Sequence, residues 1–318
     1  MRIAGAEYAL GATTRTVREL ARAGQLQSDA ALLERFGFGQ VCIAADETPY
    51  ELARHAVRLL LDRTAIDAAD IGLLIYGGPH GPTAFVTAPT MAESGAAHRT
   101  TARFRFPAAR LQHELGLDRA MVIGVDQLAC TTMFGAVRMA RALCIAEDVR
   151  HAICVCADFY PPDAGREAIW NCTSDAAAAV LVTRGDGALR IAAATHVTKG
   201  YYWDPDARRN ELVAAYFPTA RSIIERTIAE AGWTAGDVSW ILPHNVSRRS
   251  WDVLQPLAGL HQARLWDRNI ARLGHTLAGD NFINLADALA AGDIERGQRL
   301  LLFSYGYGAH WTALAVEA

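Results

Sequence analysis

The chain has 318 residues, of which 51% are hydrophobic and 20% charged, and this composition predicts a globular protein of about two domain-sized units. Its net charge is −3 at pH 7 and its pI is near 6.4, so we expect neither nucleic acid nor an anionic membrane as a partner. The first residues lack the order of a signal peptide, and no apolar run approaches the ~20 residues of a membrane helix. We therefore expect a soluble, cytoplasmic protein.

Two segments of the chain, separated by about half its length, repeat one pattern. Residues 50–78 and residues 219–245 each predict an amphipathic helix, a polar corner and a short apolar strand. In both halves a strand, a turn, a helix and a last strand follow. In the first half these are the strand 121–125, the turn at Cys130, the helix 131–146 and the strand 151–157. In the second half they are the strand 263–267, the turn at Gly274, the helix 282–291 and the strand 299–304. Alternating strands and helices predict parallel sheets, and the repeat predicts two pseudo-symmetric α/β halves, residues 1–185 and 186–318. The loops of both halves should meet at one crevice, because such sheets bind ligands at their strand ends.

Three irregular stretches interrupt this pattern. Residues 77–106 are rich in Gly, Pro and Thr and predict a long surface loop, residues 159–175 contain two adjacent prolines, and residues 199–210 carry aromatic side chains that could cover a pocket. Each stretch could also be a surface excursion without function.

Cys130 stands between the strand at 121–125 and the amphipathic helix at 131–146. A thiol at a helix N-terminus experiences unsatisfied N–H groups and the positive end of the helix dipole, which both favour the thiolate. This position makes Cys130 a candidate nucleophile, and a buried structural cysteine is the alternative.

The other five cysteines show no comparable placement. They are Cys42, Cys144, Cys154, Cys156 and Cys172. The six cysteines contain no CxxC or Cys/His metal-binding spacing, so we expect free thiols, no disulfide framework and no metal site.

Two histidines are predicted to reach the same crevice. His244 ends the strand in WILPHN, and His275 follows a glycine that allows a tight turn in LGHTLAGD. A cysteine nucleophile needs a base or a cationic neighbour, and a carboxylate fixes the tautomer of that base. Asp280 would complete a set with Cys130 and His275, and His244 would be a second donor. The alternative for Asp280 is the N-cap of a helix that begins near Phe282.

The C-terminal stretch SYGYGAHW contains Gly306 and Gly308, which allow the backbone to approach a ligand closely at a strand-to-strand turn. An N–H group of this turn, together with the N–H of Cys130, could hold a thioester oxyanion. Ordinary hairpin glycines are the alternative.

Five pieces of the sequence, in order, resemble the β-ketoacyl-ACP synthase III group of the thiolase superfamily: DQLACTTMFGA, TSDAAAAVLV, WILPHN, LGHTLAGD and YGYGAHW. The resemblance extends from about residue 40 to the C-terminus. It implies a thiolase-like αβαβα five-layered fold, a homodimer, and a cysteine acyl-enzyme formed from acyl-CoA or from the thioester of an acyl carrier protein. It also implies Cys130 as the nucleophile, His244 as the histidine of the Pro-His motif, and the N–H groups of Cys130 and Tyr307 as the oxyanion hole.

One position departs from the family pattern, because His275 stands where the family's Gly-Asn-Thr motif has Asn. The spacing from His275 to Asp280 is similar to that in divergent members from natural-product pathways, including starter-unit synthases and ester-forming acyltransferases. We therefore expect an acyltransferase that needs no cofactor and passes an acyl group from Cys130 to a small-molecule or carrier-bound acceptor. In it, His275, oriented by Asp280, would deprotonate the acceptor.

Two alternatives to this function stay open. The first is a decarboxylative condensation with a malonyl thioester, in which His244 and His275 hold the enolate oxygen. The second is a non-catalytic ketosynthase-like partner subunit, whose signature would be the loss of Cys130.

Overall fold

The computed structural model describes residues 1–78, 106–160 and 164–318. Its largest sheet has ten strands in the order β12-β11-β13-β14-β10-β1-β9-β6-β4-β5. The first half of the chain contributes β1 (Arg2–Leu10), β4 (Ile71–Gly77), β5 (Met121–Val125), β6 (His151–Asp158) and β9 (Ala176–Thr183). The second half contributes β10 (Leu189–Thr198), β11 (Trp240–Leu242), β12 (Arg264–Leu265), β13 (Arg299–Gly306) and β14 (His310–Glu317).

The strands of each half of the chain form one half of this sheet, and the two half-sheets have the same topology. In the first, β5, β4 and β6 run parallel, and β9 and then β1 continue the sheet antiparallel. The second has the same arrangement in β12, β11 and β13, followed by β14 and β10. The half-sheets are joined where β1 pairs with β10. The expected boundary at residues 185 and 186 falls between β9 and β10.

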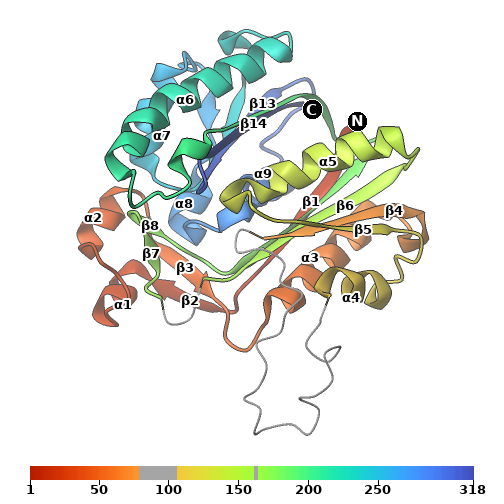
Figure 1. The fold of residues 1–318 in the computed structure, drawn as a ribbon, viewed down its shortest axis with the longest axis horizontal. Helices are drawn as coiled ribbons and strands as arrows, with labels where there is room; N and C mark the ends of the chain where they lie inside the picture. Colours follow the sequence, from red (N-terminus) through yellow and green to blue (C-terminus); the bar gives the residue numbers. More distant parts are fainter. Residues whose placement is uncertain (79–105, 161–163) are drawn as a thin grey trace, which may run out of the picture.

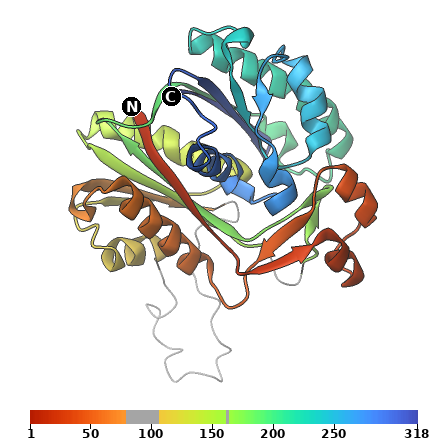
Figure 2. The same ribbon diagram turned by 180° about the vertical axis from the view of Figure 1, so that it is seen from behind.

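Helices form three layers around these half-sheets (Figure 1). The central helices α5 (Thr132–Ala146) and α9 (Asp280–Ala290) each contact strands of both half-sheets. The outer helices α3 (Pro49–Thr64) and α4 (Pro107–Glu114) cover the first half-sheet, and α6 (Arg209–Glu230) covers the second, with α7 (Arg248–Leu257) beside it. The five-layered fold that the sequence predicts is confirmed. Figure 2 shows α9 enclosed between the half-sheets and both chain termini at one end of the molecule.

The central core is apolar around both of its helices. Phe134 of α5 meets Phe282 of α9 edge to face, with ring centroids 5.2 Å apart. The window Ala129–Ala146 has the length and hydropathy of a membrane span, contrary to the expectation from the sequence, and half of it is buried inside the protein. The apolar face of α5 packs against β4 and β6, as expected for a core helix of the protein.

A smaller cap lies at one side of the molecule (Figure 1). It contains β2 (Thr13–Thr16), α1 (Val17–Arg22), α2 (Ala30–Arg35), β3 (Gln40–Ile43) and α8 (Arg268–Leu273), next to the hairpin of β7 (Glu167–Ala168) and β8 (Asn171–Cys172). Leu33 of α2, Cys172 of β8 and Ile270 of α8 share one apolar cluster. The cap thus connects the hairpin to the segment that leads to His275.

The three predicted irregular stretches differ in outcome. Most of the first, residues 79–105, lies outside the described residues, as do residues 161–163 of the second. The second was expected to be irregular throughout, but it contains the β7–β8 hairpin. The third has a short 3-10 turn at Gly200–Tyr202 and the start of α6.

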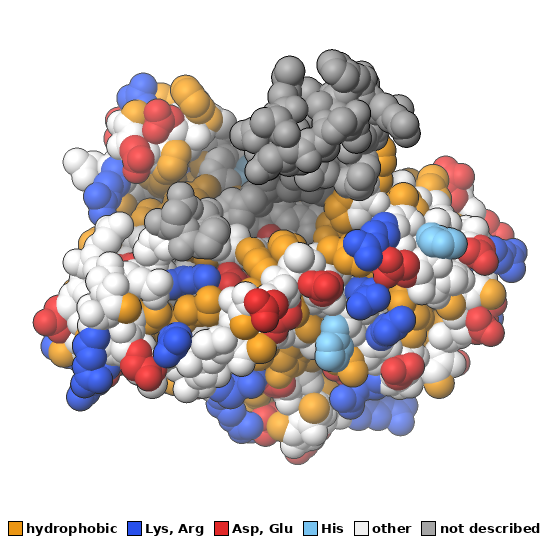
Figure 3. All heavy atoms as spheres, turned by 90° about the horizontal axis from the view of Figure 1, so that it is seen from below, with side chains coloured by type: hydrophobic (Ala, Val, Ile, Leu, Met, Phe, Trp, Pro, Cys, Tyr) orange, Lys and Arg blue, Asp and Glu red, His pale blue; other side chains and the backbone are white. Residues whose placement is uncertain are grey.

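Charged side chains of both signs are interspersed on the face shown in Figure 3, in keeping with the small net charge of the sequence.

Candidate active site

Cys130 lies in a 3-10 turn, Ala129–Thr131, that leads directly into α5. The residue before it, Ala129, has a φ of +46°, a left-handed conformation that costs a non-glycine residue about 1–3 kcal/mol and is typical of functional sites. Thr132 stabilises this turn, because its hydroxyl donates to the Ala129 carbonyl at 2.6 Å. The side chain of Cys130 is 8% exposed, so its thiol is shielded from bulk water but remains accessible.

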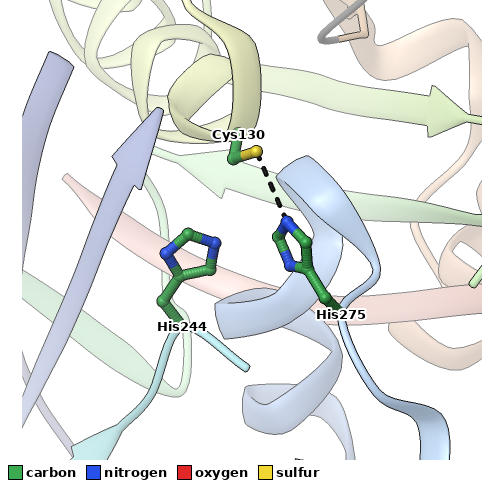
Figure 4. Close-up of side chains that lie close together, drawn as sticks. All are labelled: Cys130, His244 and His275. Atoms are coloured by element: carbon green, nitrogen blue, oxygen red, sulfur yellow. Dashed lines mark hydrogen bonds between the residues drawn. The ribbon is translucent and has the colours of Figure 1, made fainter. Parts of the chain in front are cut away.

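His275 faces the thiol from the second half of the chain (Figure 4). Its Nε2 lies 3.5 Å from Cys130 Sγ, and its Nδ1 lies 2.7 Å from Asp280 Oδ2. His275 is 4% exposed and Asp280 is fully buried. The three residues therefore form a continuous line from carboxylate to imidazole to sulfur, which is the geometry of an activated nucleophile.

The Asp280 carboxylate is held by four donors. Oδ1 accepts from the Thr276 N–H at 2.6 Å and from the Thr276 hydroxyl at 2.8 Å. Oδ2 accepts from the Asn245 N–H at 2.7 Å, in addition to its contact with His275. Asp280 is itself the first residue of α9, and Gly279 is the N-cap. The alternative that Asp280 caps a helix beginning near Phe282 is therefore wrong.

His244 completes the group on the other side of the thiol (Figure 4). Its Nδ1 accepts from the Tyr305 N–H at 3.3 Å, so its proton lies on Nε2. That Nε2 is 3.5 Å from Asp280 Oδ2 and has no hydrogen-bond partner among the described residues. His244 thus presents a buried N–H donor to the space beside Cys130.

The surroundings drive the two imidazoles into opposite protonation states. Burial disfavours the proton on His275, but the negative charges of Asp280 and Cys130 outweigh burial and raise its pKa to about 10. Burial, assisted by the positive charge of His275, lowers the pKa of His244 to about 3. Burial would raise the pKa of Asp280, but His275 outweighs it and the net shift is downward. At neutral pH the site holds one imidazolium and one neutral imidazole.

The β13–β14 turn approaches Cys130 closely. A Cβ atom placed on Gly306 would lie 3.0 Å from the Cys130 nitrogen and 2.6 Å from the Leu128 carbonyl oxygen. Only glycine fits there without displacement, so Gly306 permits the turn to reach the nucleophile. Tyr307, the predicted second oxyanion donor, is the next residue of this turn.

Cys130, His244 and His275 offer one sulfur and two nitrogen atoms that lie within 4.8 Å of one another. Zinc accepts such donors. However, His244 Nδ1 is occupied by the Tyr305 N–H and Nε2 carries the proton, so binding a metal would require the other tautomer and the loss of that hydrogen bond. The arrangement fits thiol chemistry better than metal binding.

Several residues that support the site were not singled out in the sequence. Asn284 of α9 donates to the Asn245 side chain and to the Pro243 carbonyl, both at 2.9 Å. Asn281, one turn earlier on the same helix, donates to two β-strand carbonyls at 2.8 and 2.9 Å. Two asparagines on one face of an apolar helix are a sequence signal that could have identified them. The backbone donors to Asp280 and His244 leave no such signal.

Known proteins are similar to this chain in sequence and in fold. Residues 228–318 match the 3-oxoacyl-[acyl-carrier-protein (ACP)] synthase III C-terminal family. The β-ketoacyl-[acyl-carrier-protein] synthase III of Rhizorhabdus wittichii is 23% identical in an alignment 316 positions long that covers 91% of each chain. The chain is similar to the ketosynthase III proteins of the thiolase superfamily. The resemblance stated from its motifs is thereby confirmed.

Solved structures extend this likeness. The acyltransferase ChlB3 matches this ketosynthase III-like protein with a TM-score of 0.83 at 22% identity, over 100% of this chain and 97% of its own. The priming β-ketosynthase from the R1128 polyketide biosynthetic pathway matches with a TM-score of 0.78 at 20% identity, over 99% and 95%. One of these neighbours is named a transferase and the other a ketosynthase. At these identities the likeness shows the fold alone, and the fold does not separate the two reactions.

Proposed function

We propose that this protein is an acyltransferase that forms an acyl-enzyme on Cys130 and passes the acyl group to an alcohol or amine. The observation that carries this proposal is the line from Asp280 through His275 to Cys130, with contacts of 2.7 and 3.5 Å. A buried carboxylate that holds one imidazole nitrogen leaves the other free to move a proton.

In the first step, the Cys130 thiolate attacks the carbonyl carbon of an acyl thioester. The N–H groups of Cys130 and Tyr307 would hold the oxyanion of the tetrahedral intermediate. When the intermediate collapses, the bond to the leaving sulfur breaks, and that sulfur takes the Nε2 proton of His275. The products are a free thiol, an acyl-Cys130 thioester and a neutral His275.

In the second step, neutral His275 accepts the proton of the acceptor, whose oxygen or nitrogen attacks the acyl carbon. The bond to Cys130 breaks, and the thiolate–imidazolium pair is restored. Acylation itself prepares this step, because it removes the Cys130 charge that helps to raise the pKa of His275. His275 is thus an acid in the first step and a base in the second.

One observation favours a second candidate function, decarboxylative condensation with a malonyl thioester. His244 presents an N–H without a partner among the described residues, and such a donor suits an enolate oxygen. The carboxylate behind His275 favours plain transfer, because condensation needs no general base for an acceptor.

The biological setting is part of the same proposal. We propose acyl-CoA or an acyl carrier protein as the donor, a small or carrier-bound acceptor, a homodimer, and action in the cytoplasm. The likeness to the priming synthase of the R1128 polyketide biosynthetic pathway supports a place in natural-product biosynthesis.

Intact-protein mass spectrometry tests this function directly. The protein is incubated with a panel of acyl-CoAs that includes malonyl-CoA, and the adduct is mapped by digestion. We expect an adduct on Cys130, its loss in Cys130→Ala, and its retention in Cys144→Ala, which removes a buried thiol of α5. An adduct that keeps the malonyl carboxylate favours transfer over condensation. No adduct from CoA or carrier-bound donors would overturn the proposal.

A further inference from the structure

The backbone that leads to Cys130 is held in an unfavourable conformation. Gln127 and Ala129 have φ values of +63° and +46°, in the left-handed region that residues other than glycine rarely adopt. Such conformations persist only where the surrounding structure holds them, and they are concentrated at functional sites. The position of the Cys130 thiol and N–H therefore depends on contacts that fix residues 127–130, which we call the nucleophile segment.

Two carbonyl groups of the nucleophile segment are fixed by the residues that follow it. The Thr131 hydroxyl donates to the Leu128 carbonyl at 2.6 Å, and the Thr132 hydroxyl donates to the Ala129 carbonyl, also at 2.6 Å. Neither hydroxyl holds the carbonyl of Gln127, the first residue of the segment. The partner of that carbonyl comes from the second half of the chain.

This partner is His310, the first residue of β14. Its Nδ1 lies 2.8 Å from the hydroxyl of Thr198, at the end of β10. Burial lowers the pKa of His310, and a hydrogen bond with the Gln127 backbone raises it by less. An interaction that raises the pKa of an imidazole accepts its proton, so the bonded group is the Gln127 carbonyl. Because Nδ1 faces Thr198, the nitrogen that donates to Gln127 is Nε2.

The turn between β13 and β14 has room for this ring. Gly308 has a φ of +82°, and a Cβ atom placed on it would lie 2.8 Å from His310 Nε2, so a side chain there would crowd the nitrogen that faces Gln127. Ala309 is also left-handed, with a φ of +60°, and its carbonyl accepts from the Lys199 N–H at 2.9 Å. The turn is therefore anchored next to His310.

His310 joins the two backbone segments that carry the predicted oxyanion donors. The nucleophile segment supplies the N–H of Cys130, and the β13–β14 turn supplies the N–H of Tyr307. Gly306, which pairs with His310 across this turn, approaches the Cys130 nitrogen so closely that an added Cβ would lie 3.0 Å from it. The two segments belong to different halves of the chain, so local backbone geometry does not set the separation of the donors. An oxyanion hole is effective only when its donors are preorganised.

We infer that His310 is a positioning residue, which holds the Gln127 carbonyl and thereby fixes the two oxyanion donors relative to each other, while Thr198 orients its ring. This inference rests on the proposed function, in which Cys130 attacks a thioester. A role as a second general base suits His310 less, because both of its ring nitrogen atoms already form hydrogen bonds. Activation of the thiol belongs to His275, which contacts Cys130 Sγ.

Two reactions of Cys130 distinguish positioning of the oxyanion donors from a general structural role. Acylation by a thioester develops an oxyanion, whereas alkylation by iodoacetamide displaces iodide without one and needs only the thiolate. The donor is the fastest of acetyl-, malonyl-, hexanoyl- and benzoyl-CoA with the wild-type protein. In His310→Ala we expect the maximal rate of acylation to fall about 100-fold. The half-saturating concentration of the donor and the rate of alkylation should each stay within about twofold.

Three further variants define the contact. In His310→Gln the side-chain amide can donate to the Gln127 carbonyl, so we expect acylation to recover to within about tenfold of the wild type. His196→Ala is the matched control, because it removes a neighbouring histidine of β10 that contacts Arg138, and it should acylate at the wild-type rate. Thr198→Val removes the hydroxyl that orients the ring and should lower acylation alone by about tenfold. It tests the same contact if His310→Ala does not fold.

The contrary outcomes are distinct. Wild-type acylation by His310→Ala would overturn the positioning role, and so would an equal loss of acylation and alkylation. Acylation by His310→Gln as slow as that of His310→Ala would exclude the hydrogen bond to Gln127. A comparable loss in His196→Ala would assign the effect to a disturbed β10–β14 edge. A wild-type protein that no thioester acylates, on CoA or on a carrier protein, would overturn the proposed function and this inference with it.

Discussion

The rings of His244 and His275 meet edge to face with their centroids 4.7 Å apart, yet their pKa values shift in opposite directions. The difference arises from the nitrogen that each ring presents to Asp280. His275 Nδ1 lies 2.7 Å from the carboxylate, whereas His244 Nε2 lies 3.5 Å away. A single buried negative charge can stabilise only one imidazolium here, and the closer ring obtains it. Two chemically identical side chains thereby acquire different roles.

Replacing Asp280 by Asn should separate these roles. Asn keeps the shape of the side chain but removes the charge that holds the proton on His275, so we expect transfer to the acceptor to fall by about 10²–10⁴-fold, and by more than self-acylation. Stopped-flow measurement of both steps with one acyl-CoA checks this. Asp287→Asn is the matched control on the same helix, because Asp287 binds Tyr8 and Asn269 away from the thiol. Equal loss in both variants would reduce Asp280 to a structural residue.

The low pKa of His244 should make the free energy of unfolding decrease at acidic pH. Its pKa is about 3 in the folded protein and near 6.5 in the unfolded chain. Between these values the unfolded state binds one more proton, so the free energy of unfolding decreases as the pH falls from about 6.5 towards 3, by about 1.4 kcal/mol per pH unit for this group.

Urea unfolding between pH 6.5 and 4 tests this linkage. The curve of His244→Phe should fall less steeply than that of the wild type, whereas His113→Gln, which replaces an exposed histidine of α4, should follow the wild type. Parallel curves for all three proteins would show that His244 takes up its proton in the folded state as readily as in the unfolded chain.

The sequence predicts the framework better than the site. Strand 121–125 and helix 131–146 match β5 and α5 to within one residue, because local periodicity determines them. The start of α9 was placed two residues late, since Asp280 faces His275 instead of capping the helix. The proximity of Cys130 and His275 could be anticipated only through the internal repeat and the family resemblance.

Two features had no accessible signal in the sequence. The β7–β8 hairpin was missed because Ile169-Trp170 is the opposite of a turn sequence. The donors that hold Asp280 and His244 are largely backbone N–H groups, and every non-proline residue has one. Tertiary packing, rather than residue type, decides which of them point into the site.

A methyl group on Gly306 should impair the site without unfolding the protein. The added Cβ would lie 2.6 Å from the Leu128 carbonyl oxygen and 3.0 Å from the Cys130 nitrogen. In Gly306→Ala the turn or the segment that leads to Cys130 must therefore shift, which disturbs the predicted oxyanion donors. Loss of such a donor costs about 10²–10³ in rate, and we expect a decrease of that order in acylation of Cys130. Gly200→Ala is the control, since nothing lies within 4 Å of its added Cβ. Wild-type acylation by Gly306→Ala would exclude an oxyanion role for this turn.

The free edge of β5 offers a surface for the expected homodimer. β5 ends the sheet order, so one side of its backbone is unpaired among the described strands, and Met121 on it is 44% exposed. Apolar edge strands readily pair with a second copy, and antiparallel pairing of two β5 strands would extend the sheet across both molecules. The opposite edge, β12, has only two residues.

We therefore expect Met121→Lys to convert a dimer to a monomer in sedimentation velocity, while Val253→Lys, on an exposed position of α7, leaves the dimer intact. A dimer that survives Met121→Lys would place the interface elsewhere.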